Sequence, residues 1–172
     1  PRALAVLGLF AGGLPLIHTH SFLALALLSA GTCAYVVATA PRAQRWAAFR
    51  PWLLYGTVAA ALSLPQLVAF TFVQATDSDH FLQLWFNWIN NRGHQGLVDS
   101  YLWFYLKNIG VPYVLIFLAL CRRKPRGLDA LPDDIRQNRL LASGAFLIYI
   151  VAELVKFQPN EYDNNKLFYV WF

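Results

Sequence analysis

The chain has 172 residues, of which 58% are apolar, 16% aromatic and only 13% charged. Ordinary soluble domains carry about 25% charged residues, because a soluble core needs a charged surface around it. The composition therefore argues against an ordinary soluble domain and indicates a membrane protein. The net charge of +5 does not indicate nucleic-acid binding, because the basic residues stand at the ends of apolar segments rather than along one exposed stripe.

Four apolar segments are long enough to cross a membrane, for which a helix needs about 20 mostly apolar residues. The predicted spans are residues 16–40, 52–73, 101–121 and 140–157, and a further helix begins at 166–172. The predicted fold is an all-α, multi-pass transmembrane helix bundle. Because the sequence starts with Pro1 and contains no Met, we expect residues 1–172 to be a fragment of a single transmembrane domain within a longer protein.

Glycine and proline mark the breaks between these segments. The run Gly12-Gly13-Leu14-Pro15 separates a short apolar piece from the first span and predicts a turn or an unwound junction. Pro65 is expected to kink the second span. Pro159 is expected to end the fourth, because the residue before a proline disfavours helix.

The basic residues predict how the chain threads the membrane. Residues 41–50 contain Arg42, Arg45 and Arg50 without an acid, and residues 122–139 are also rich in Arg and Lys. By the positive-inside rule both segments are cytoplasmic. The intervening segments, residues 74–100 and 158–165, then lie outside. All the histidines and several acids therefore fall at or near the outer face.

The outer segment contains an amphipathic pattern at about residues 80–91. Phe81, Leu84, Trp85 and Trp88 recur at helical spacing, with amide side chains on the other side. This pattern predicts an interfacial helix, with its aromatic rings at the level of the headgroups.

Two histidines stand at the outer start of the first full helix. His18 and His20 are two residues apart, a spacing that places side chains about 200° apart in a regular helix. They cannot share a metal ion unless the backbone there is unwound. Either they cap the helix, or one or both bind an anionic headgroup or a substrate phosphate.

Lys107 and Glu153 are charged residues inside predicted spans. A charge at the bilayer centre costs about 2.5–3.5 kcal/mol on insertion scales, so each is expected to face the interior of the bundle. We predict that the two approach each other, or that Lys107 lines a cavity for an anion. The alternative is snorkelling to the membrane surface.

A polar run, Asn160-Glu161-Tyr162-Asp163-Asn164-Asn165, separates two apolar segments. It is either a solvated connecting loop, for which Asn and Asp are common, or a carboxylate and amide cluster at the mouth of a membrane cavity. Such a cluster can orient a sugar or phosphate, or hold a divalent cation.

Three stretches, at 13–25 (GLPLIHTHSFLAL), 103–112 (WFYLKNIGVP) and 157–168 (FQPNEYDNNKLF), resemble polytopic membrane proteins of the GT-C glycosyltransferase type. The resemblance implies transfer of a sugar from a polyprenyl-phosphate donor on the non-cytoplasmic face. The partners implied are membrane lipid and the lipid-phosphate-linked sugar donor. The acidic residues that members carry in an early outer loop have no clear match here.

Under this resemblance Glu161 and Asp163 are the catalytic candidates. The candidate substrate-binding residues are His18, His20, Lys107, Asn108, Gln158, Asn160 and Asn164. No metal ligands are assigned, and participation of a divalent cation stays open. A base near the acceptor hydroxyl and cationic or donor groups near the departing phosphate are what this reaction requires.

Two other kinds of protein fit the same sequence. One is a transporter or flippase for a lipid-linked or anionic solute, using the broken helix near Gly13 and the charges of Lys107 and Glu153. The other is a structural membrane subunit without chemistry of its own. In each case the expected location is an integral, multi-pass position in a cell membrane or an endoplasmic reticulum-type membrane.

Overall fold

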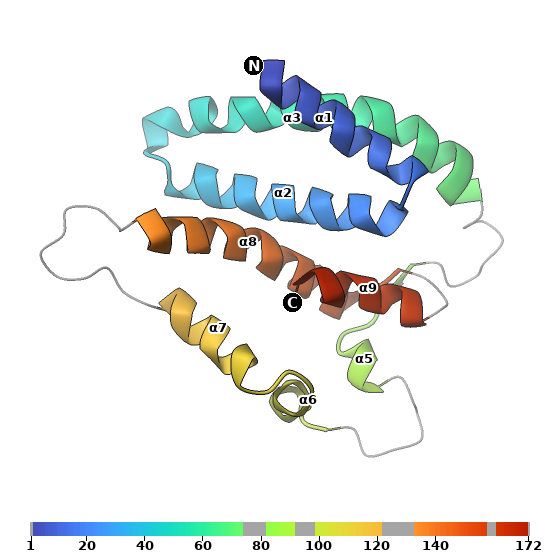
Figure 1. Cartoon of the computed structure of the whole chain (residues 1–172), viewed down its shortest axis with the longest axis vertical. Coiled ribbons are helices and arrows are strands. Elements are labelled where there is room, and N and C mark those ends of the chain that lie inside the picture. The colour runs from blue at the N-terminus through green and yellow to red at the C-terminus, as the bar shows by residue number, and fades with distance from the viewer. Residues whose placement is uncertain (1, 74–81, 92–98, 122–132, 158–160, 172) are drawn as a thin grey trace, which may run out of the picture.

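A computed structural model describes residues 2–73, 82–91, 99–121, 133–157 and 161–171, and these are almost entirely helical (Figure 1). The main helices are α1 (Arg2–Gly13), α2 (Thr19–Thr39), α3 (Arg45–Gln66), α5 (Trp88–Asn91), α6 (Tyr101–Asn108), α7 (Val111–Cys121), α8 (Asp133–Leu154) and α9 (Glu161–Trp171). Short helical turns lie at η1 (Leu14–Leu16), η2 (Arg42–Gln44) and η3 (Leu67–Phe72), and short strands at β1 (Gln83–Leu84) and β2 (Val155–Lys156).

The first two predicted spans are confirmed as long apolar helices. Helix α2 has 21 residues, and the continuous helical stretch Arg42–Phe72 has 31 residues; both are long and apolar enough to cross a membrane. Both differ from the prediction at their first residues, since α2 begins at Thr19 and α3 already begins at Arg45. Helices α6 and α7 pass the same test when they are counted as one span.

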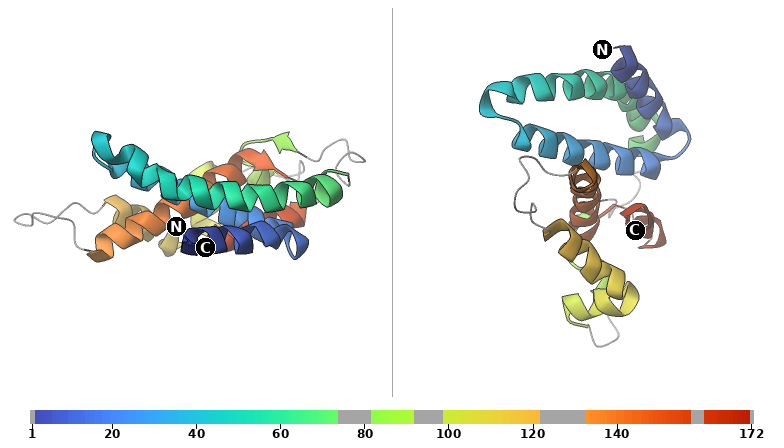
Figure 2. Two further views of the ribbon diagram at one scale, coloured as in Figure 1. Left: turned by 90° about the horizontal axis from the view of Figure 1, so that it is seen from above. Right: turned by 60° about the vertical axis from the view of Figure 1, so that its left-hand side comes forward.

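The helices form successive layers in which α2 lies between α3 and α8 (Figure 1). Helix α1 packs on α3, and α9 packs on α8. Helices α6 and α7 lie beyond α8, on the side away from α2 (Figure 2).

Glycines allow the closest helix contacts. A Cβ atom at Gly31 of α2 would lie 2.6 Å from the carbonyl oxygen of Ser143, and one at Gly144 of α8 would lie 2.5 Å from the carbonyl oxygen of Leu28. The backbones of α2 and α8 therefore touch directly. Small residues bring membrane helices together in this way.

The break predicted between the first two helices is confirmed. Helix α1 ends at Gly13, the 3-10 turn η1 follows with Pro15 in it, and α2 starts at Thr19. The irregularity expected at Pro65 is also present, because the chain changes from α-helix to the π-helical turn η3 directly afterwards. Proline removes a backbone donor and crowds the preceding turn.

The prediction of one span at 101–121 is wrong in its geometry. Helices α6 and α7 meet at an angle of 110°. Gly110 lies between them with φ +75°, a conformation that favours glycine. Pro112 lies in the first turn of α7, which begins at Val111, where its missing N–H is not needed.

The interfacial helix predicted at about 80–91 is also wrong. Residues 80 and 81 lie outside the described residues, β1 pairs antiparallel with β2, and only Trp88–Asn91 is helical. The backbone N–H groups of Trp85 and Asn87 donate to the carbonyls of Leu154 and Glu153, at 2.9 and 3.2 Å. The last carbonyls of a helix have no partner within it, so the segment satisfies the end of α8 instead of its own helix.

The last two predicted segments have different bounds in the structure. Helix α8 begins at Asp133 rather than at residue 140 and ends at Leu154, where β2 follows. Helix α9 begins at Glu161, so residues 161–165, which were expected in a loop, are helical. The further helix expected from residue 166 is confirmed with an earlier start.

Candidate functional site

The two ends of the molecule carry different polar residues. The turn η2 and the start of α8 lie at one end in Figure 1, and the turn η1 and the end of α8 lie at the other. A small pocket of about 320 Å³, lined by Gln44 and Arg136 among others, joins the two arginine-bearing segments. In the described residues the arginines of both segments therefore share one end, and His18 and His20 occupy the opposite end.

His18 caps helix α2, as one of the two interpretations of this residue predicts. Its Nδ1 accepts a hydrogen bond from the backbone N–H of Ser21 at 3.1 Å. In a neutral imidazole the hydrogen then sits on Nε2, which can donate to an anion. The cap has an extended backbone, with φ −158° and ψ 101°, so the regular-helix argument does not apply, and the rings of His18 and His20 lie 5.6 Å apart.

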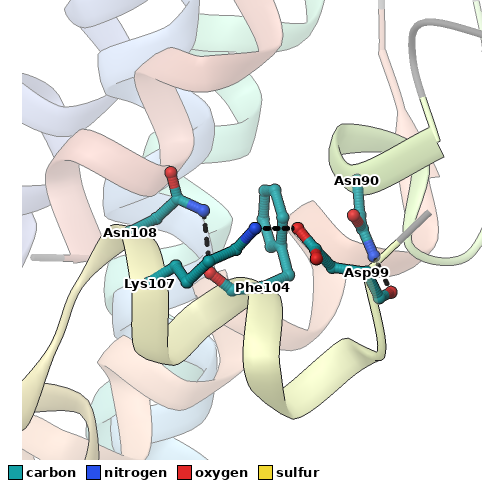
Figure 3. Close-up of polar contacts among 5 residues, drawn as sticks. All are labelled: Asn90, Asp99, Phe104, Lys107 and Asn108. Carbon is teal, nitrogen blue, oxygen red and sulfur yellow. Dashed lines mark hydrogen bonds and ion pairs between the residues drawn. The ribbon is translucent and has the colours of Figure 1, made fainter. Parts of the chain in front are cut away.

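Lys107 forms its ion pair with Asp99, not with Glu153 (Figure 3). Both side chains are partly exposed, at 45% for Lys107 and 30% for Asp99. The side chain of Asn90 fixes this segment by donating to the backbone carbonyl of Asp99 at 2.7 Å. The predicted approach of Lys107 to Glu153 is therefore wrong, because a carboxylate on the segment leading into α6 is nearer.

Other predicted site residues are engaged locally or have only their backbone described. Asn108 donates to the carbonyl of Phe104 in its own helix, at 2.7 Å. Glu161, Asp163 and Asn164 lie in the first turns of α9, where acids are stabilised by the helix dipole. Gln158 and Asn160 lie outside the described residues.

An apolar cavity of about 860 Å³ lies between α2 and α3, and Ala11 of α1 also contributes to its lining. Its lining includes many small residues, among them Ala26, Ala30, Ala34, Gly56 and Ala60. It extends along α2 from Phe22 to Val37, which is about 22 Å at 1.5 Å per residue. Binding sites for small molecules have volumes of about 300–1,000 Å³, so the cavity is large enough for an apolar ligand.

A second site, which the sequence did not predict, lies among α6, α7, α8 and α9. The hydroxyl of Tyr149 hydrogen-bonds to that of Tyr101, and at 3.2 Å to that of Tyr113. The ring of Trp171 packs on Tyr149, with centroids 4.6 Å apart. These aromatic side chains belong to one buried cluster with Trp88, which donates from Nε1 to the carbonyl of Ala152 at 2.7 Å.

Glu153 lies beside this aromatic cluster and is only 2% exposed. Neither of its carboxyl oxygens has a hydrogen-bond partner among the described residues. The hydroxyl of Tyr101, on α6, lies near the carboxyl group. The signal in the sequence was the spacing of Tyr149 and Glu153, which at i and i+4 share one face of a helix.

The described part of the chain contains no group of three His, Cys, Asp or Glu side chains able to hold a metal ion. Comparisons with family models, with curated proteins and with solved structures find no match.

Proposed function

We propose that this chain belongs to a multi-pass membrane glycosyltransferase that takes a sugar from a polyprenyl-phosphate donor on the non-cytoplasmic face. The observation that carries the proposal is the apolar cavity between α2 and α3. It lies between the helices that are long and apolar enough to cross a membrane. An elongated cavity in this position suits the hydrocarbon chain of a lipid-linked donor.

The end of the cavity at Phe22 is one helical turn from His18, whose carbonyl accepts a hydrogen bond from the backbone N–H of Phe22 at 3.2 Å. A donor whose chain fills the cavity would bring its phosphate to the level of His18 and His20. Nε2 of His18 is the ring nitrogen that remains available to donate to that phosphate, since Nδ1 caps the helix. A hydrogen-bond donor aimed at the departing phosphate stabilises the charge that develops on it.

The acceptor hydroxyl needs a base, for which Glu161 and Asp163 are the candidates. Residues two apart in an α-helix lie about 200° apart around its axis, and both positions belong to α9. One of the two, and not both, then serves a single acceptor. Separate Glu161→Gln and Asp163→Asn variants should therefore differ, with one losing most of its activity and the other keeping it.

Helix α6 runs in a different direction from the long helices. It is seen end-on in Figure 1, across the direction of α2 and α3. If those helices cross a membrane, α6 runs parallel to its plane. Leu102 and Trp103 are more than half exposed on it, whereas Tyr105 is buried in the aromatic cluster, and exposed aromatic residues favour the interface.

A reconstituted assay with lipid-phosphate sugars of different chain lengths tests the proposal. Ala60→Phe would place a ring inside the cavity, because Ala60 lines it. We expect the KM for a long-chain donor to rise about tenfold, which corresponds to about 1.4 kcal/mol of lost binding. The KM for a short-chain donor should change less, because a short chain does not fill the cavity.

Ala61→Phe is the matched control, since Ala61 is exposed and does not line the cavity. It should leave both KM values unchanged. Equal effects of the two substitutions would remove the cavity from donor binding. Absence of a glycosylated product with every lipid-phosphate sugar would contradict the glycosyltransferase itself.

Glu153 favours a transporter or flippase as the second candidate. Ionisable residues buried among membrane helices often mark ion or substrate pathways, and α6 and α7 form a broken helix of the kind found in transporters. Movement of a lipid-linked or anionic solute across proteoliposomes, without formation of a product, would decide for this candidate.

A further inference from the structure

Glu153 is a buried acid whose carboxyl oxygens accept no hydrogen bond from the described residues. The Tyr101 hydroxyl of α6 lies near its carboxyl group. Tyr113 of α7 belongs to the same group of hydroxyls because it hydrogen-bonds to the hydroxyl of Tyr149. From α9 the neighbours in the cluster are aromatic rings, including Trp171. Strand β1 and the turn after it contribute backbone, with the N–H of Asn87 bound to the main-chain carbonyl of Glu153.

Two lysines on neighbouring elements contact other groups. Lys107 on α6 is paired with Asp99. Lys156, in the strand that follows α8, lies with its ammonium 5.6 Å from the centre of the Trp85 ring. The carboxyl oxygens of Glu153 remain without a hydrogen bond from the described residues.

A charged carboxylate in such a place is strongly unfavourable. An ionised group removed from water costs far more than a neutral one unless it is paired, and a buried acid usually takes up a proton instead. The neutral acid has one O–H donor and keeps acceptor capacity. A tyrosine hydroxyl can both donate and accept a hydrogen bond. Tyr101 can therefore accept from the acid O–H or donate to the acid carbonyl.

We propose that Glu153 binds a proton and is protonated in this packed arrangement. The hydroxyls of Tyr101, Tyr149 and Tyr113 form the path along which that proton leaves. When the carboxyl O–H bond breaks, Tyr101 accepts the proton and passes its own hydroxyl proton to Tyr149, which passes its proton to Tyr113. The products are the Glu153 carboxylate and one proton, which leaves from Tyr113 to water when the cluster opens. The site goes beyond the proposed transfer reaction and does not depend on it.

The release of the proton has a consequence for the packing. The Glu153 carboxylate would be left without a partner beside the aromatic cluster, so α8 would have to shift relative to α6 and α9 to admit water or a cation. The protonated acid therefore stabilises the packed arrangement, and the ionised acid favours an opened one.

Infrared difference spectroscopy of the whole protein in lipid nanodiscs tests this site. We expect the spectrum of wild type minus Glu153→Gln near neutral pH to show the carbonyl stretch of a protonated carboxylic acid. The matched control is Asp99→Asn, whose difference spectrum should show the bands of an ionised carboxylate because Asp99 is paired with Lys107. Carboxylate bands for Glu153 as well, from an ionised acid or one holding a cation, would overturn the proposal.

Tyr101→Phe tests the hydroxyl line, which is formed by the side chains of Tyr101, Tyr149 and Tyr113. Loss of a nearby hydroxyl makes the surroundings of the acid carbonyl less polar and raises its stretching frequency, so the Glu153 band should move to higher frequency. An unmoved band would remove the tyrosines from the site.

Wild-type protein gives a second test that does not depend on a folded Glu153 variant. An apolar carbodiimide adds the protonated acid across its C=N bond, and the adduct rearranges to a stable acylurea without losing an atom. Peptide mass mapping should find this adduct on Glu153 and not on Asp99. An adduct on Asp99, with Glu153 unmodified, would overturn the proposal.

Discussion

The region formed by α1, α2 and α3 and the region formed by α5 to α9 are packed in different ways. In the first, small residues bring helices together and leave an apolar cavity of about 860 Å³ between α2 and α3. In the second, aromatic side chains fill the interior, and their hydroxyls form a hydrogen-bonded line beside a buried acid. The first region is suited to receiving an apolar ligand, and the second is suited to holding a fixed arrangement of polar groups.

Of the substitutions that test this difference in packing, those at Trp88 should have the largest effect on the free energy of unfolding. Its side chain is 1% exposed, and its Nε1 donates to the carbonyl of Ala152. Trp88→Ala should lower the free energy of unfolding by about 3–5 kcal/mol, because it empties a filled interior. Thermal unfolding in detergent micelles measures the change.

Trp88→Phe separates packing from hydrogen bonding. It keeps a ring in the cluster but leaves the Ala152 carbonyl without its donor, so it should cost about 1–3 kcal/mol. A destabilisation by Trp88→Ala of less than about 1 kcal/mol would show that this region is not packed as described.

A smaller effect is expected at Gly144, where α8 joins the two regions by touching α2. A Cβ atom there would lie 2.5 Å from the carbonyl oxygen of Leu28, so Gly144→Ala should cost about 1–3 kcal/mol. Gly56→Ala is the control, because nothing lies within 4 Å of a Cβ atom at Gly56, and its effect should stay within about 0.5 kcal/mol. Equal shifts of the unfolding temperature for both variants would contradict the close α2–α8 contact.

The sequence predicted the first region well because length and apolarity decide its structure. A run such as residues 16–40 has few alternatives in a membrane to a helix, whose backbone groups satisfy one another. The glycine and proline break near Gly13 could be predicted from local geometry alone. The cavity could not, because it depends on how far α2 and α3 stand apart.

The second region was predicted less well because distant contacts decide it. The aromatic spacing at 80–91 fits a helix, yet Trp85 and Asn87 instead complete the end of α8. The bend at Gly110 had a local signal in the nearby Pro112, and apolarity alone did not reveal it. The hydroxyl line unites Tyr101 with tyrosines of α7 and α8 that lie far apart in the sequence, so no spacing rule could predict it.

The smallest effect on stability is expected at the partly exposed ion pair at α6, in the second region. Lys107 and Asp99 are partly exposed, and exposed ion pairs contribute about 0–1 kcal/mol. Lys107→Ala should therefore change the free energy of unfolding by less than about 1 kcal/mol, as should Asp99→Asn.

Donor binding distinguishes a structural ion pair from an anion site at Lys107. If Lys107 meets the donor phosphate, Lys107→Ala raises the KM for the donor, whereas Asp99→Asn lowers it, because the ammonium no longer has a competing carboxylate. If the Lys107–Asp99 ion pair only holds the start of α6 in place, the two variants change the KM for the donor in the same direction. A KM for the donor that neither substitution alters would exclude Lys107 from substrate binding, and His18 and His20 would remain the phosphate-binding candidates.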